Sequence, residues 1–190
     1  MSTVEPIRDV KKIDAIKRIL KKESPRNYLL FTLGINTGLK VSDLLRLKVT
    51  DVVDSKNRVK DFLIVNDRKN GQGKKFILNQ TVKGAINDYM ESVRGIKMDQ
   101  YLFASRKGEN QPISRIQAWQ VLNDAAQRVG IVSPIGTHTL RKTFGYHAYR
   151  QGTDVAHLQK IFNHLAPSIT LRYIGVTEEE LDQVQINLNL

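Results

Sequence analysis

Four side chains towards the carboxyl-terminal end have the types and the spacing for chemistry on a phosphate. In THTLRKTFGYHAY, His138 and Arg141 lie one turn apart on a predicted helix, so they share a face. His164 follows in FNHLAPSITLRY, and Tyr173 ends that segment. A guanidinium binds phosphate oxygens well, and a tyrosine hydroxyl can act as a nucleophile. Each residue alone has a plainer interpretation, since a His-x-x-Arg pair usually decorates a surface and such a tyrosine usually packs.

The composition favours a polyanionic partner. Lysine and arginine number 30 against 19 acids, a formal net charge of +11. Such an excess attracts nucleic acid through charge and counterion release, although a merely basic globular protein has the same composition. Cysteine is absent, which excludes disulfides, thiolate metal sites and cysteine nucleophiles. Because the acids are scattered and His-x-x-Arg is not a zinc-ligand arrangement, we expect no metal and no cofactor.

The sequence contains no membrane or export signal. The segment MSTVEPIRDVKKID lacks an apolar signal stretch, and no apolar run reaches the roughly 18 residues of a membrane span. We therefore expect a cytoplasmic protein with no membrane partner and no small-molecule substrate.

Apolar periodicity and turn residues predict a mainly α chain with one small antiparallel β-sheet, an α+β class. Residues 26–36 are apolar almost all round and should form a central, buried helix between breaks at Ser24-Pro25 and Thr37-Gly38. A short helix over 41–48 has Ser42 as its expected cap. The polar stretch NDRKNGQGKK is typical of a hairpin turn between strands 62–65 and 76–78. The other predicted helices span 9–22, 80–94, 114–129, 137–150, 154–164 and 168–174.

Three further residues are expected to be structural. Trp119 should belong to the core rather than to a base-stacking surface. His147 and His157 lie outside the pattern of candidate site residues and are expected to be ordinary helical positions.

Taken together, residues 137–175 resemble the second conserved box of the tyrosine recombinases, which runs from His-x-x-Arg to a nucleophilic tyrosine. Asn163 stands where that family usually has glycine, and asparagine also tolerates left-handed backbone. The segment GINTGLKVSDLLRLKVTDV resembles the first box, which has the pattern Thr-Gly-Leu-Arg-x-Ser-Glu-Leu. Asp43 replaces the glutamate of that pattern, and Lys40 replaces its first catalytic arginine.

The resemblance implies a role for each site residue. Tyr173 would attack DNA and hold a 3′-phosphotyrosyl intermediate, while Arg141 and His164 would bind the non-bridging oxygens. Lys40 would substitute for a second guanidinium, and His138 would orient the site or assist proton transfer. The family's hairpin lysine, often in Lys-Thr-Gly-Lys, would donate a proton to the departing 5′ oxygen. Lys69 is the first candidate for it, and Lys74 is the second.

The resemblance also implies the architecture and the partner. Residues 1–177 would form the catalytic domain with the tyrosine recombinase fold, without the family's N-terminal core-binding domain. Residues 178–190 would form a tail or helix that can dock on a neighbouring protomer, because Thr177 and the glutamates after it make a good helix start. Double-stranded DNA would be the partner, bound by a homo-oligomer, a tetramer.

The implied function is site-specific recombination, as integration, excision or inversion, by metal-independent strand cleavage and rejoining. Two alternatives remain open at this point. A DNA-binding regulator of the same fold would have weakened or lost cleavage because Lys40 replaces arginine. A relaxing enzyme similar to type IB topoisomerases would share the chemistry.

Overall fold

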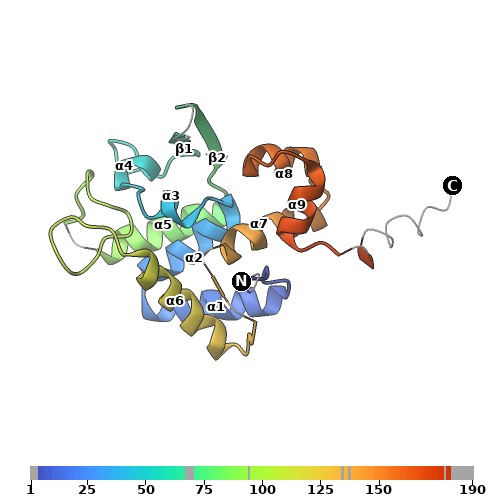
Figure 1. Ribbon diagram of the computed structural model, residues 1–190. Helices are drawn as coiled ribbons and strands as arrows, with labels where there is room; N and C mark the ends of the chain where they lie inside the picture. Colours follow the sequence, from blue (N-terminus) through green and yellow to red (C-terminus); the bar gives the residue numbers. More distant parts are fainter. Residues whose placement is uncertain are drawn as a thin grey trace.

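Helices dominate the structure, a computed structural model that describes residues 4–66, 71–93, 95–133, 135–136, 138–177 and 179–180 (Figure 1). In chain order, the elements are α1 Val10–Glu23, α2 Pro25–Thr37, α3 Val41–Leu44, α4 Val49–Val52, β1 Phe62–Asn66, β2 Gly73–Ile77, α5 Gln80–Ser92, α6 Arg115–Arg128, α7 Thr139–Arg150, α8 Val155–Phe162 and α9 Pro167–Ile174. The predicted class, mainly α with a small antiparallel sheet, is confirmed. None of the helices in the described ranges has the length and apolar character that crossing a bilayer requires.

The central helix is α2, as its sequence predicts. Ser24 ends α1 and caps α2, since its side chain accepts a hydrogen bond from the Asn27 amide, and Pro25 occupies the first turn. Gly38 ends α2 in left-handed conformation with φ 65°. Between these ends α2 packs against α1, α5 and α7. Its side chains fill the middle of the main core, where Leu29, Leu30, Phe31 and Leu33 are almost fully buried.

The helix predicted over 41–48 is wrong beyond its first turn. The chain leaves α3 because its backbone pairs with a distant segment: the Leu47 carbonyl accepts from the Leu102 amide at 2.7 Å, and the Val49 amide donates to the Gln100 carbonyl at 3.0 Å. The helix α4, which the sequence did not predict, begins only after this pairing. Tertiary hydrogen bonds thus override local helical propensity.

Two local predictions also need correction. Ser42 is not a cap, because α3 begins at Val41 and Lys40 occupies the N-cap position without a side-chain hydrogen bond. Trp119 is not a core residue, because it is 40% exposed and its indole donates to the Ile135 carbonyl at 2.7 Å. The helix α6 buries a different face, which carries the small residues Ala118, Ala125 and Ala126 with Leu122.

The two strands form an antiparallel hairpin whose register runs from Phe62 opposite Ile77 to Asn66 opposite Gly73. Leu63 points into the main core and is fully buried. The far end of the hairpin reaches α8, where the Lys74 ammonium donates to the Lys160 carbonyl at 3.3 Å. Lys69, at the predicted turn, lies outside the described residues.

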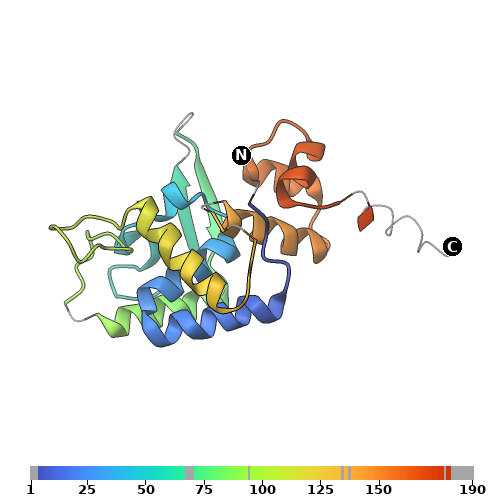
Figure 2. The ribbon, with the colours of Figure 1, turned by 60° about the horizontal axis from the view of Figure 1, so that its bottom comes forward.

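Helices α8 and α9 stand apart from the rest of the molecule. Figures 1 and 2 show them beyond α7, away from α1, α5 and α6. They have a small core of their own, formed by Leu158, Phe162 and Ile174. Gly145 lets α7 approach this core closely, because a Cβ there would lie 2.5 Å from Ile174 Cγ2 and 2.7 Å from Phe162 Cζ. The α8–α9 unit is therefore joined to the body mainly through α7.

We expect Gly145→Ala to lower the free energy of unfolding by about 1–3 kcal/mol, because the added methyl overpacks the contact of α7 with α8 and α9. The matched control is Gly84→Ala in α5, where a Cβ meets no atom within 4 Å. That variant should gain about 0.5–1 kcal/mol from helix propensity alone. Urea denaturation of both variants measures the difference. Equal changes in the two variants would contradict the tight approach at Gly145.

Candidate active site

Tyr173 lies in the last turn of α9, half-buried among aromatic rings. Its ring centroid is 5.0 Å from that of His164 and 5.5 Å from that of Phe162, both in edge-on geometry. Its hydroxyl lies 3.2 Å from Nδ1 of His138. Packing therefore fixes the ring, and a hydrogen bond to an imidazole holds the hydroxyl.

The first residues of helix α7 lie next to this tyrosine in space. His138 occupies its N-cap position, and Arg141 follows in the first turn, with only 6% of the residue exposed. The Arg141 guanidinium donates a short hydrogen bond to the carbonyl of Gly38 and lies 4.4 Å from the ring centroid of Phe162. Since Gly38 belongs to the loop that carries Lys40, this bond joins the two sequence boxes in space.

Lys40 faces the same site. It lines a cavity of about 370 Å³ that also exposes Arg141, Lys74 and Asn163. Its ammonium is close enough to His164 for its charge to lower the pKa of that imidazole. The structure thus places Lys40 at the open side of the site, with Arg141 deeper.

His164 is oriented by its neighbours. Asn163 ends α8 in left-handed conformation, with φ 58° and ψ 46°, as expected for the residue in the family's glycine position. The Nδ1 atom of His164 lies 3.0 Å from Oγ1 of Thr170, a buried hydroxyl on α9. That contact turns the other ring nitrogen away from Thr170, so it can meet a ligand.

Burial and positive charge set the protonation states. Burial lowers the pKa of His138, and the charges of its neighbours Arg141, Arg115, Lys142 and Lys40 lower it further. Burial and the charges of Arg141 and Lys40 lower the pKa of His164 in the same way. Burial raises the pKa of Tyr173, and the Arg141 charge opposes that rise. At neutral pH both imidazoles are therefore neutral and the phenol is protonated, so His138 can accept the phenol's proton.

The hairpin supplies one lysine to the site. Lys74, the second of the two candidates, lines the cavity together with Lys40 and Arg141. Lys69, the first candidate, lies outside the described residues. Within the described ranges no group of three or more histidine, aspartate or glutamate side chains is placed to hold a metal ion.

Two neighbours of the tyrosine were not singled out from the sequence. Lys142 is buried, with only 6% of the residue exposed, and its ammonium lies 5.3 Å from the ring centroid of Tyr173. Its spacing, one turn after His138 on the same helix face, could have indicated it. Phe162 packs on Arg141, His164 and Tyr173 at once, and nothing distinguishes it in sequence from any other apolar residue of a helix.

Comparison with known proteins decides the family. Residues 8–180 match the model of the phage integrase family. The chain belongs to that family. It is 44% identical over 179 residues to a probable integrase/recombinase, YoeC, of Bacillus subtilis, which covers 94% of this chain and 93% of that protein. It spans between 54% and 58% of the length of the curated XerA and XerC recombinases that it matches.

Solved structures agree on the fold of this integrase family member. The crystal structure of XerA recombinase superposes with a TM-score of 0.77 at 20% identity, covering 99% of this chain and 68% of that one. XerH recombinase, bound to a palindromic difH substrate, gives 0.74 at 16% identity, covering 98% and 53%. The chain is a tyrosine recombinase catalytic domain, and the family that its sequence resembles is confirmed.

The lowered histidine pKa values predict the pH profile of cleavage. Because the pKa of His138 lies below its ordinary value of about 6.5, the imidazole stays neutral as the pH falls to that value, and it protonates only in more acidic solution. The cleavage rate at subsaturating DNA should therefore fall only below about pH 6.5. The variant His138→Gln should lose this acidic limb, and His164→Gln should keep it. A limb that is unchanged in His138→Gln would show that another group accepts the proton.

Proposed function

We propose that this protein is a site-specific recombinase that cuts and rejoins double-stranded DNA through a 3′-phosphotyrosyl intermediate, in integration, excision or inversion. The observation that carries the proposal is that Tyr173, hydrogen-bonded to a neutral imidazole, lies beside Arg141, which lines one cavity with Lys40 and Lys74. This arrangement holds a nucleophile, a proton acceptor and a phosphate-binding surface within one site.

In the cleavage step, the Tyr173 oxygen bonds to the scissile phosphorus and its proton passes to His138. The bond from phosphorus to the 5′ oxygen breaks, and a hairpin lysine, Lys69 or Lys74, donates a proton to that oxygen. Arg141 and Lys40 line the cavity and lie near His164, and these three groups stabilise the negative charge that develops on the non-bridging oxygens. Rejoining is the reverse, with the 5′ hydroxyl of another strand as the attacking group. The phosphotyrosyl bond conserves the energy of the broken bond.

The partner and the assembly follow from charge and family. The net charge of +11 suits DNA. We propose a tetramer on DNA in the cytoplasm, with residues 1–177 as the catalytic domain and 178–190 as a segment that docks on a neighbouring protomer. Residues 181–190 lie outside the described part of the chain. The regulator without cleavage is less favoured, because the structure brings His138, Arg141, His164 and Tyr173 together with Lys40.

Tyr173→Phe should abolish covalent adduct formation and leave DNA affinity within a few-fold, because the hydroxyl is the nucleophile while affinity arises from many phosphate contacts. The test captures nicked duplexes of randomised sequence that stay attached to the wild-type protein under denaturing conditions, and peptide mapping then locates the adduct. The chelator EDTA should not change the yield, because side chains supply the positive charge. An adduct on another tyrosine, or none from the wild type, would overturn the proposal.

Lys40→Arg should raise the single-turnover cleavage rate, because a guanidinium offers two parallel hydrogen bonds to the transition-state charge where lysine offers one. One such contact is worth about 1–3 kcal/mol, or roughly 5- to 150-fold in rate. Lys40→Ala should be slower than wild type. The rates are measured at saturating protein on the captured duplex. Equal rates for all three proteins would show that Lys40 does not act on the phosphate.

A further inference from the structure

The nucleophile and the phosphate-binding cations lie on different parts of the molecule. Tyr173 belongs to the α8–α9 unit with its small core, whereas Lys40 belongs to the body. Catalytic groups must be held within about 0.5 Å of their productive positions. A contact that ties the α8–α9 unit to the rest of the chain can therefore control cleavage without touching DNA.

The amino-terminal segment makes such a contact. In Figure 2 it runs from α1 towards the end of the molecule that carries α7 and α9. Ile7 anchors it, because its side chain is buried in the main core and its amide donates to Oγ1 of Thr143 at 2.9 Å. The Ile7 carbonyl lies 2.8 Å from Nε2 of His147. His147 is thus not the ordinary helical position that the sequence suggested, because its imidazole joins α7 to the amino-terminal segment through this hydrogen bond.

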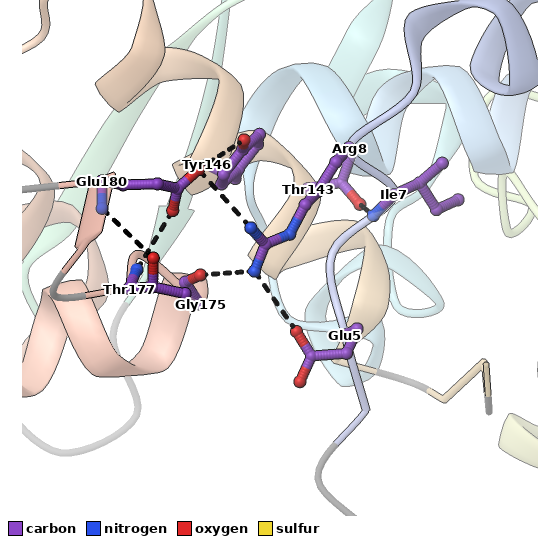
Figure 3. Close-up of polar contacts among 8 residues, drawn as sticks. All are labelled: Glu5, Ile7, Arg8, Thr143, Tyr146, Gly175, Thr177 and Glu180. Atoms are coloured by element: carbon purple, nitrogen blue, oxygen red, sulfur yellow. Dashed lines mark hydrogen bonds and ion pairs between the residues drawn. The ribbon is translucent and has the colours of Figure 1, made fainter. Parts of the chain in front are cut away.

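Arg8, the next residue, reaches the end of the nucleophile helix (Figure 3). Its guanidinium donates to the carbonyl of Gly175 at 2.6 Å and lies 5.0 Å from the ring centroid of Tyr146 on α7. Gly175 is the left-handed cap of α9, two residues after Tyr173. A cation at this point is favourable, because the carboxyl end of a helix carries partial negative charge.

Glu180 completes the cluster on the other side of Arg8. Its carboxylate accepts from the Tyr146 hydroxyl at 3.0 Å and lies 3.5 Å from the Arg8 guanidinium. It also forms a reciprocal capping pair with Thr177, as the sequence of that turn predicts. The Arg8 side chain is 39% exposed, so its ion pairs with Glu180 and Glu5 are individually weak. The short bond to Gly175 is the contact that fixes the helix end.

We propose that Arg8 is a positioning residue for Tyr173. By holding the end of α9 and the turn after it against α7, it sets the position of the phenol relative to His138 and Arg141. The inference rests on the proposed cleavage function and names a residue, far from the phosphate site in sequence, on which that function depends.

The first test is the rate of cleavage by Arg8→Gln on the duplex captured with wild-type protein. A displaced nucleophile costs up to about 100-fold, so we expect a 10- to 100-fold slower single-turnover rate with DNA affinity within a few-fold. The final yield of adduct should equal that of the wild type. Arg8→Lys should recover part of the rate, since an ammonium can still donate to Gly175. The control is Arg18→Gln, which changes an exposed arginine of α1 with no hydrogen bond or ion pair to other described residues and should leave the rate unchanged.

A bridging sulfur at the 5′ position of the DNA separates positioning from proton donation, because a thiolate leaves without a proton. On this substrate Arg8→Gln should still cleave more slowly than the wild type. A variant that lacks the lysine that protonates the leaving oxygen should come closer to the wild-type rate. A wild-type rate for Arg8→Gln would overturn the inference. A lower adduct yield at the wild-type rate would overturn it too, because that result means only that less of the protein is folded.

Hydrogen exchange of the free protein tests the same contact without cleavage. In Arg8→Gln, amides of α9 should exchange faster than in wild type, and amides of α2 should not change. Unchanged exchange in α9 would also overturn the inference. If the wild type forms no tyrosine adduct, the proposed function fails; if it does and only the Arg8 results fail, the function stands and the positioning role does not.

Discussion

A positive charge that is almost completely buried needs a partner, and leaving Arg141 without one would cost several kcal/mol. One partner is the Gly38 carbonyl, which accepts from one N–H, and the charge of Asp43 and a hydrogen bond with Tyr173 also favour the charged guanidinium. Position 38 must be glycine for two reasons: its backbone has φ 65°, and a Cβ there would collide with the Phe144 ring. The end of α2, the loop of Lys40 and the start of α7 are thereby locked into one arrangement.

More cationic than anionic side chains line the resulting site. Asp43 is the acid whose charge acts on Arg141, while Lys40, Lys74 and Arg141 line the same cavity. Mutual repulsion makes this arrangement costly in the free protein, and a bound phosphate removes the cost, so DNA should stabilise the native state. The same positive field lowers the pKa of His138. One charge distribution therefore both attracts the substrate and keeps the proton acceptor neutral.

Sequence reasoning succeeds here where a residue's role is local. The capping Ser24, the left-handed Gly38 and Asn163, and the spacing from His138 to Tyr173 depend on short stretches of chain. Sequence reasoning fails where contacts between distant segments determine the local structure. The pairing of residues 47–49 with 100–102 cut a predicted helix short, and α6 turned its alanines rather than Trp119 inwards. The contact of Arg8 with Gly175 joins the two ends of the chain, so no local pattern could indicate it.

The position of the nucleophile is a tertiary property. The helix α9 has eight residues, too few for stability on its own, so its neighbours determine where it lies. On one side its last residue, Ile174, packs so closely on Gly145 of α7 that a methyl group there has no room, and such packing resists displacement steeply. Beyond Ile174 the contacts are polar: the bond from Arg8 to Gly175 holds the helix end, and the partly exposed ion pair of Arg8 with Glu180 adds little. The end of α9 that carries Tyr173 is therefore held on one side by the packing of Ile174 against Gly145 and on the other by the bond from Arg8 to Gly175.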